Sequence, residues 1–537
     1  MPLPAHAATA ADIALAVVAY RGLVSPLLRW CAERLGSGRY PETALNGAYP
    51  ERAPRPGPSL AAGAALLAAG AAYGVVGSTP PGAMALVPEA ALLLVWWKYL
   101  TLDYDAALSV RWQRADRIVV LAVGAAALLL PALALAALGV LCGRLGGWTH
   151  HSKACIRLVK VAFCWSLSDG VLHALGLTSA ASGSTALVVL LGTAYLSHYV
   201  VAARSKAKLG RRPWSWTLEN RTDLLVASSY SWGWARFVPA RTAATLVNGL
   251  RPASPFLNAG TMVLELAGLV AFADEWCFVA AVAGAVVFNC VVALTSGLLF
   301  WENIGVGMVL AGVVSTSREA GDATAFGLWP WLFSNALMAA VLAGWAWRPT
   351  GLGWWDTPFT ARVVWTVRTR DGKQYGLHND FFSPHDREYA RALGNPLVPE
   401  PFVTFSLGGV EDTALRDLLV RARPHQDDIE HAKHRHGTVQ WSGPYTERHT
   451  TYLRRLLSNL NAGAPKSPLP RFLSRLKAPG GHLYYWGDLP RYRRDRGPVS
   501  EVAVWYREEL YSSERRTWLR LRNQFLFALE IPIAGPH

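Results

Sequence analysis

Long runs of apolar positions alternate with short polar turns over roughly the first two thirds of the chain. About 20 apolar residues are enough to cross the hydrocarbon core of a bilayer, so these runs predict about eight membrane spans. Turn signals such as STPPG and SAASGST separate neighbouring runs. Three shorter or more broken apolar segments, at 11–30, 222–250 and 303–316, are each compatible with a further span, a re-entrant piece or an interfacial helix. The predicted spans are 60–77, 82–99, 117–144, 158–177, 184–203, 256–273, 276–301 and 323–347.

The remaining third of the chain has a different pattern. In VVWTVRTRDGKQYGL a DG pair lies between two alternating runs, which is a strong signal for a β-hairpin. The segments SEVAVWYREELYS and RRTWLRLRNQFLFALEI alternate as well and are joined through SSERR. Helices are expected near 386–394, 412–422 and 446–461. This part is predicted to be a soluble α+β domain.

Composition and charge support the same division. The 537 residues are 52% hydrophobic and 17% charged, against about 25% charged in an ordinary soluble domain. Charged residues are about one in eight up to Trp347 and about one in four from Arg348 onward. The predicted fold is an all-α polytopic membrane bundle of about 8–9 spans followed by a smaller α+β domain. The three parts are an N-terminal amphipathic, membrane-associated segment (1–57), the membrane bundle (58–347) and the soluble domain (348–537).

The basic balance of the chain fits a multi-pass integral membrane protein. The net charge is +15, and Lys and Arg beside spans fix orientation and attract anionic lipid. No signature of a nucleic-acid-binding domain accompanies this charge, so nucleic acid is not an expected partner. MPLPAHAATAADIAL lacks the basic n-region of a signal peptide. None of the six cysteines has CxxC spacing, so we expect them to be small buried hydrophobes.

Ionisable residues inside predicted spans are the first candidates for function, because each costs about 2.5–3.5 kcal/mol on insertion scales. Asp169 and His173 are four residues apart, so they share a helix face and form either a general-base pair or a neutralised acid. Glu265 lies in TMVLELAGL. Glu302 in FWENIG follows a long uncharged run, either as an interfacial residue or as an acid at the mouth of a cavity.

Two acidic segments outside the spans are further candidates. Asp103 and Asp105 flank Tyr104; two acids this close raise one another's proton affinity, although a solvated loop explains them as well. The tail segment HQDDIEHAKHRH places His431 and His434 at helical spacing, but it lacks a closed metal motif and reads by default as a solvated helix. DDIE and NDFFSPHDRE loosely resemble the magnesium motifs of terpene synthases, although Pro384 breaks the helix that the second motif requires.

The segment HYVVAARSKAKLGRRPWSW ends the 184–203 run with a cluster of cations and tryptophans. Lys and Trp are common at membrane interfaces, where long lysine stems reach the water phase. By composition alone Lys206, Lys208 and Trp214 are interfacial anchors.

The order of landmarks in this region resembles the HTTM family, the membrane domain of vitamin K-dependent gamma-glutamyl carboxylase and many bacterial relatives. The resemblance covers roughly 90–345, and WDTPF, DGK and DFFSP in the tail are similar to bacterial members. Relatives often carry His where Asn289 precedes Cys290 here. The spacing from alanine to lysine is about two residues longer, which leaves Lys206 and Lys208 both open, with Lys208 preferred because Leu209 follows it. The matching residues are Tyr199, Ala202, Ala203, Lys208, Leu209 and Trp214, then Ser254, Pro255, Phe256 and Glu265, then Ser296, Phe300, Gly307 and Met308.

The resemblance implies a membrane-embedded lysine that acts as a general base on vitamin K hydroquinone. Burial disfavours the ammonium form and makes such a lysine a usable base. We expect Lys208 in this role, assisted by Glu302 or by Asp169 and His173. The expected substrate-binding residues are Lys206, Trp214, Glu265, Asn289 and Trp301.

The expected substrate is a lipophilic quinone or isoprenoid, because fewer than 200 residues remain after the spans to hold a peptide. The sequence does not identify the cofactor; a reduced quinone is one candidate, and Mg²⁺ is the other if the protein is a cyclase. One alternative is a membrane terpene cyclase, started by Asp105 or by Mg²⁺ at the tail, whose 23 tryptophans stabilise carbocations. Another is a non-catalytic scaffold or transporter, although the sequence shows no two-fold repeat of broken helices.

Overall fold

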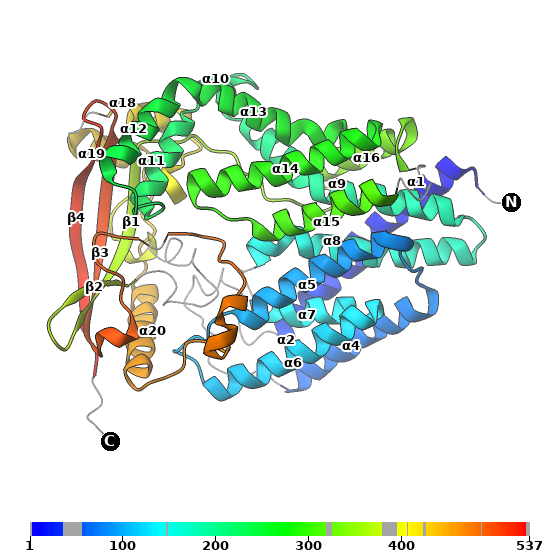
Figure 1. The fold of residues 1–537 in the computed structure, drawn as a ribbon, viewed down its shortest axis with the longest axis horizontal. Coiled ribbons are helices and arrows are strands. Elements are labelled where there is room, and N and C mark those ends of the chain that lie inside the picture. Colours follow the sequence, from blue (N-terminus) through cyan, green and yellow to red (C-terminus); the bar gives the residue numbers. More distant parts are fainter. Residues whose placement is uncertain are drawn as a thin grey trace.

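A computed structural model describes residues 3–35, 56–145, 149–317, 325–377, 395–404, 406–422, 426–484 and 486–532. The molecule is elongated, with a bundle of long helices at one end and a β-sheet domain at the other (Figure 1). The N-terminus lies at the far end of the bundle and the C-terminus lies beside the sheet.

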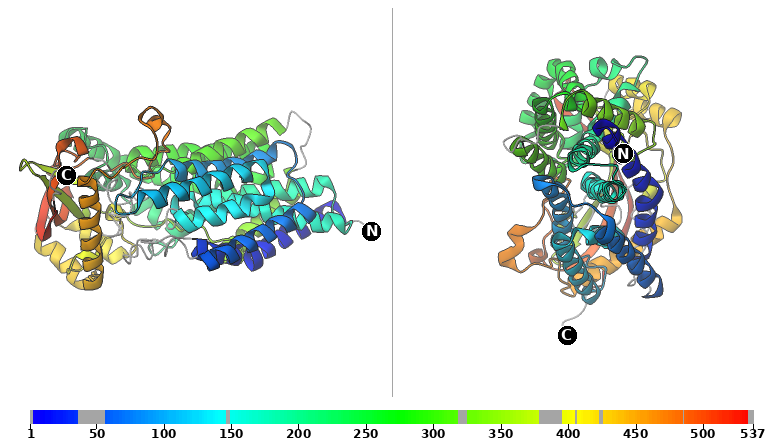
Figure 2. Two further views of the ribbon diagram at one scale, coloured as in Figure 1. Left: turned by 90° about the horizontal axis from the view of Figure 1, so that it is seen from below. Right: turned by 90° about the vertical axis from the view of Figure 1, so that its right-hand side faces the viewer.

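The helical bundle contains five helical segments that are long and apolar enough to cross a membrane: 5–35, 57–76, 82–101, 180–207 and 275–296. Their axes run roughly parallel, as the end-on view in Figure 2 shows. The first of them, in the predicted N-terminal segment, contributes Ile13, Val24 and Leu28 to the bundle core. The bundle helices are α1 (Ala5–Ala19), α2 (Ser25–Leu35), α4 (Pro56–Val76), α5 (Leu86–Thr101), α6 (Val110–Leu129), α7 (Ala134–Leu145), α8 (Thr149–Ala174), α9 (Ala180–Ala207), α13 (Ser254–Leu266), α14 (Glu275–Ser296), α15 (Trp301–Ser317) and α16 (Leu328–Leu342).

One predicted span is wrong in its form. The uncharged run 117–144 is not a single helix, because α6 ends at Leu129 and α7 begins at Ala134. Pro131 lies at the break, where a proline removes a helical hydrogen bond. The two helices pack against each other as a hairpin. The predicted run 323–347 is likewise longer than the observed helix, α16.

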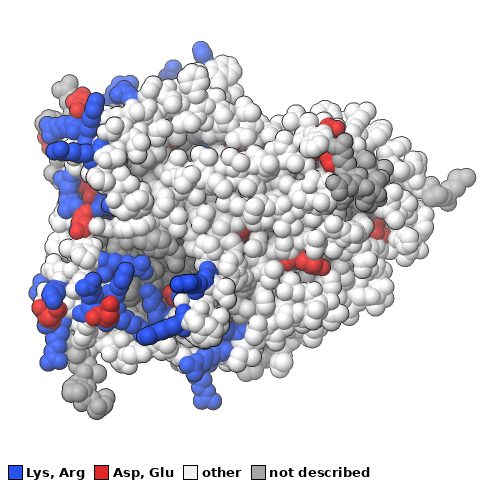
Figure 3. Space-filling model, viewed as in Figure 1, with Lys and Arg blue, Asp and Glu red and all other residues white. Residues whose placement is uncertain are grey.

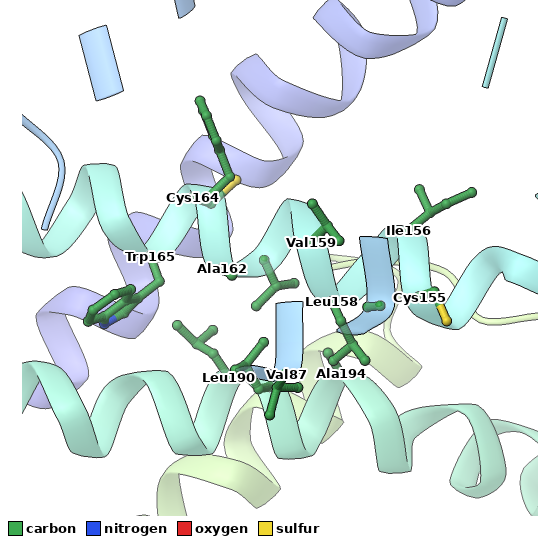
Figure 4. Close-up of a cluster of buried hydrophobic side chains, with 14 of the residues drawn as sticks. Val87, Cys155, Ile156, Leu158, Val159, Ala162, Cys164, Trp165, Leu190 and Ala194 are labelled. Atoms are coloured by element: carbon green, nitrogen blue, oxygen red, sulfur yellow. The ribbon is translucent and has the colours of Figure 1, made fainter. Parts of the chain in front are cut away.

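Helices α8 and α9 form the centre of the bundle. Side chains from both helices pack beside Val87 of α5 (Figure 4), and Cys155 belongs to the same buried cluster. Most of α9 is buried, from Ser182 to Lys206. The cysteines Cys31, Cys142, Cys155 and Cys164 are buried and free, whereas Cys277 and Cys290 are exposed.

The apolar segment 222–250 does not join the bundle as a span. It forms α11 (Thr222–Trp232) and α12 (Ala240–Leu250), which follow the short helix α10 (Ser215–Glu219). These helices pack against strands of the sheet domain. The region between α9 and α13 therefore lies at the boundary between the two parts of the molecule (Figure 1).

The C-terminal part contains a four-stranded antiparallel sheet with the order β2-β1-β3-β4. The strands are β1 (Phe359–Thr369), β2 (Gln374–Leu377), β3 (Val499–Ser512) and β4 (Thr517–Glu530). The predicted hairpin at DG is confirmed as β1 and β2, and the two C-terminal alternating runs are β3 and β4. The helices α18 (Thr413–Arg421) and α20 (Gly443–Asn461) lie where sequence predicted helices, and α19 (Gln426–His436) lies between them. The helix predicted at 386–394 lies outside the described residues.

The core of the sheet domain extends into connections of the bundle. Ala106, Ala107, Leu209 and Trp216 belong to the same buried cluster as the inner faces of the strands and α20. Lys and Arg gather at this end of the molecule, and the opposite half of the face in Figure 3 shows none. The connections 77–81, 130–133 and 175–179 at the far end of the bundle contain no Lys or Arg.

Candidate functional site

The C-terminal end of α9 separates the two candidate lysines. Lys206 is 9% exposed, whereas Lys208 follows the last residue of the helix and is exposed to solvent. The desolvation that turns a lysine into a base requires burial. That condition is met at Lys206 and not at Lys208, the lysine that the sequence favoured.

Lys206 forms an ion pair with Glu265 of α13. Its Nζ also lies 5.2 Å from the centre of the Trp216 ring, within range of a cation–π contact. Glu265 is 2% exposed, and its Oε2 atom has no hydrogen-bond partner among the described residues. A buried carboxylate with an unused acceptor is a place where a ligand or a proton is bound favourably.

The segment 351–356, which leads into the sheet domain, covers this pair. Gly353 lies so close to α9 that an added Cβ would be 2.6 Å from the backbone carbon of Ser205. The Trp216 Nε1 donates to the carbonyl oxygen of Trp354 at 2.8 Å. The site therefore lies between the bundle and the segment 351–356, which we call the roof of the site.

Asp356 completes the roof. Its carboxylate accepts hydrogen bonds from Asn220 Nδ2 at 2.8 Å and from Trp354 Nε1 at 3.0 Å. Burial raises the pKa of Asp356 to about 6, although these two hydrogen bonds and the charge of Lys206 act in the opposite direction. A carboxyl group with this pKa exchanges a proton near neutral pH.

The Ser-Pro-Phe landmark has a structural role in this geometry. Ser254 donates to the Asp223 carboxylate at 3.1 Å, and Asn258 donates to the carbonyl oxygens of Thr217 and Asn220 at 3.1 and 2.9 Å. These bonds fix the turn between α10 and α11 that carries Asn220. Phe256 is 80% exposed on the outside of the bundle.

A buried chain of hydroxyl and amide groups lies inside the bundle, near the Lys206–Glu265 pair. Asn289 Nδ2 donates to the Tyr199 hydroxyl at 2.6 Å, Tyr199 donates to the Tyr195 hydroxyl at 3.3 Å, and Tyr195 donates to the carbonyl oxygen of Asn303 at 3.1 Å. Glu265 is close enough to act on Tyr199 electrostatically. The Asn303 Oδ1 atom has no partner in the described part of the chain.

Glu302, the residue before Asn303, belongs to a second buried lysine–glutamate pair. Lys98 of α5 forms an ion pair with Glu302, which is fully buried, and Ser152 donates to Glu302 at 3.1 Å. The ring of Trp301 contacts Trp97 edge to face at 5.2 Å and is 8% exposed. Sequence reasoning missed Lys98 and Ser152, because a lysine after two tryptophans at the end of a span has the pattern of an interfacial anchor.

The other predicted site residues lie apart from this chain. Asp169 is buried and its acid neighbour is Asp12 of α1, which contacts Ser168. His173 is exposed, and no hydrogen bond joins it to Asp169 in the part of the chain that the structure describes. Trp214 is 54% exposed, as expected of an interfacial anchor.

The two acids beside Tyr104 do not share a site. Asp103 pairs with Lys477, whereas Asp105 is buried against α20 and accepts a hydrogen bond from the Ala107 amide at 2.9 Å. Burial raises the pKa of Asp105 to about 7, and Asp103 is not among the causes. Asp105 therefore belongs to the core of the sheet domain.

His431 and His434 lie on the exposed face of α19, whereas His436 is half-buried and pairs with the Asp412 carboxylate at 2.8 Å. The buried face of this helix is formed by Ile429, Ala432 and Lys433. Among the described residues, no group of three or more His, Cys, Asp or Glu side chains is arranged to hold a metal ion. The segment NDFFSPHDRE lies outside the described residues.

Comparison of the chain with protein-family models, with curated proteins and with solved structures gave no match. The resemblance to the HTTM family therefore rests on the residues quoted above and stays a prediction. The helical segments of spanning length define a membrane-associated helical protein with a small antiparallel sheet domain.

Proposed function

We propose that the protein is a multi-pass integral membrane enzyme, with about 8–9 crossings, that acts on a lipophilic small molecule at the Lys206–Glu265 pair. The five long apolar segments and the shorter helices packed against them support the multi-pass arrangement. The short connections 77–81, 130–133 and 175–179 at the other end of the bundle contain no Lys or Arg, and this asymmetry favours the cytoplasmic side for the sheet-domain end.

The observation that carries this proposal is the burial of Lys206 against an acid with one unused oxygen. In a site of low dielectric constant, a proton passes easily between an ammonium and a carboxylate, because the neutral pair avoids the cost of two buried charges. Transfer of one proton from Lys206 to Glu265 leaves a neutral amine and a neutral acid.

The neutral amine of Lys206 then takes the proton of an acidic hydroxyl group on the substrate. Reduced quinones carry such a hydroxyl, and they are the class that the resemblance implies. The Trp216 ring supplies apolar surface for a substrate ring beside the amine. Asp356, whose pKa is raised to about 6 by burial, is a second group beside the pair that changes its protonation near neutral pH. The role first assigned to Lys208 passes to Lys206 in this proposal.

The test compares lipid extracts by mass spectrometry from cells that produce the wild-type chain, Lys206→Arg or Lys208→Arg. Arginine keeps the positive charge beside Glu265, but it does not lose its proton at physiological pH. We expect the lipid change caused by the wild type to disappear with Lys206→Arg and to persist with Lys208→Arg. Monodisperse elution of both variants in detergent serves as the folding control.

Persistence of the lipid change with Lys206→Arg contradicts a base at this position. A lipid profile that is identical with and without the wild-type chain favours the scaffold or transporter alternative. Release of hydrocarbon from added prenyl diphosphates identifies the cyclase alternative.

A further inference from the structure

A second recessed site lies in the sheet domain, on the side that faces the end of the bundle. This pocket lies between β1, the C-terminal end of α11 and residues 484 and 486–489, and its space of about 660 Å³ includes volume that is open to solvent. Its walls combine aromatic rings with two arginines and one acid. These lining residues include Trp232, Tyr484, Trp486, Arg362, Arg507 and Asp488.

The charges around this pocket leave a positive excess. Asp488 pairs with Arg236, Arg507 and Arg520, and Glu509 pairs with Arg362. Four guanidinium groups therefore face two carboxylates. Although burial opposes ionisation, the arginines hold the pKa of Asp488 at about 2, so both the acid and its partners stay charged at neutral pH.

Arg362 has hydrogen-bond donors to spare. Its side chain is 10% exposed and its Nη2 donates to Glu509 at 3.2 Å. Its Nε and Nη1 atoms make no hydrogen bond with the described residues and remain accessible from the pocket. Burial and the neighbouring arginines lower the pKa of Arg362 to about 10, so an anion placed here relieves repulsion among cations.

An apolar surface leads from the pocket to the outside of the bundle. Trp486 contacts Phe237 at 5.1 Å and Trp234 at 6.0 Å between ring centres. Phe237 is 66% exposed, and Trp234 donates to the carbonyl oxygen of Leu294, a 73% exposed residue in the last turn of α14. This path joins a polar pocket to a surface of a membrane-length helix.

We propose that the pocket binds the phosphate head group of an anionic membrane lipid, with its hydrocarbon chains lying over Trp486 and Phe237 toward the end of α14. Arginine guanidinium groups form bidentate hydrogen bonds with phosphate oxygens. Aromatic side chains are common at the boundary between lipid head groups and hydrocarbon chains. This site is separate from Lys206 and does not depend on the enzymatic proposal.

The test measures binding of phosphatidic acid, phosphatidylcholine and inorganic phosphate to the full chain in detergent micelles by native mass spectrometry. We expect saturable binding of phosphatidic acid that is at least about tenfold weaker with Arg362→Gln and with Arg507→Gln. Arg368→Gln is the matched control, since Arg368 is on the same strand but pairs only loosely with Glu501 at 3.8 Å. Phe237→Ser, on the exposed surface, is expected to weaken binding of phosphatidic acid while leaving the arginines unchanged.

Three results overturn the proposal. Equal binding of phosphatidylcholine removes the role of the anionic head group, and equal loss with Arg368→Gln removes the role of the pocket. Binding of inorganic phosphate as tight as that of phosphatidic acid, with no effect of Phe237→Ser, assigns the site to a soluble anion instead of a lipid.

Discussion

The buried carboxyl group of Asp105 makes a quantitative prediction for stability. Its Oδ1 accepts hydrogen bonds from the Ala107 amide at 2.9 Å and from the Tyr452 hydroxyl at 3.4 Å. Its Oδ2 has no partner among the described residues. Burial raises the pKa from 3.8 to about 7, so the folded state prefers the protonated form.

The sign of the effect follows from this direction. Between pH 3.8 and about pH 7 the folded state holds a proton that the unfolded state has lost, so the free energy of unfolding falls as pH rises through this window. At 1.36 kcal/mol per pKa unit, the full penalty above pH 7 is about 4 kcal/mol. For a domain of this size, that corresponds to about 8–16 °C in Tm.

Asp105→Asn removes the ionisation and keeps one acceptor oxygen. We expect the variant to be more stable than the wild type at pH 8, and this advantage to shrink as the pH falls to 5. Thermal unfolding in detergent, followed by tryptophan fluorescence, measures both profiles. Asp103→Asn is the control, because Asp103 and Lys477 are 19% and 31% exposed and such a pair contributes less than about 1 kcal/mol. Parallel pH profiles for Asp105→Asn and the wild type from pH 5 to pH 8 refute the reasoning.

Three other changes test the remaining structure. Lys98→Met leaves Glu302 buried and unpaired and is expected to lower the free energy of unfolding by about 3–5 kcal/mol. The double variant Lys98→Met/Glu302→Gln is expected to recover most of this loss. If thermal unfolding shows the same loss for the single and the double variant, the two side chains do not act as an ion pair. Gly353→Ala is expected to lower the free energy of unfolding by about 1–3 kcal/mol, because the added Cβ pushes the segment 351–356 away from α9. Gly249→Ala is the control, because its Cβ meets open space in a helix and is not destabilising. Equal melting temperatures for the two variants contradict the close contact at Gly353. Burial lowers the pKa of His449 from 6.5 to about 3, so the free energy of unfolding is expected to fall by up to about 5 kcal/mol as the pH drops from 6.5 to 3. If acid unfolding of His449→Gln follows the same pH profile as that of the wild type, this expectation is wrong.

Local patterns were sufficient for most of the secondary structure. The DG turn and the alternation around it specify β1 and β2, because a two-residue period and a left-handed glycine, with φ of 81° at Gly372, are local properties. The apolar runs specify long helices for the same reason. Pro131 in the sequence also indicates the helix break, but the length of the uncharged run alone predicts a single span.

Burial of individual charges was not readable in this way. Lys206 and Lys208 are two residues apart in one basic segment, and only the packing of α13 and of the segment 351–356 against α9 buries the first and leaves the second in water. In the same way, only tertiary packing buries Lys98 beside Glu302. A partner that is 59 or 204 residues away leaves no periodic signal beside the lysine.

The sequence by itself determined that a long apolar helical part precedes a polar α+β part, since hydropathy and alternation are sums over neighbouring residues. The tertiary structure alone decided which charges meet. It paired Lys206 with Glu265 and Lys98 with Glu302, and it placed Arg362 beside aromatic rings in a pocket. The physical reason is that desolvation and pairing depend on distances across the fold, which segments far apart in the chain set together.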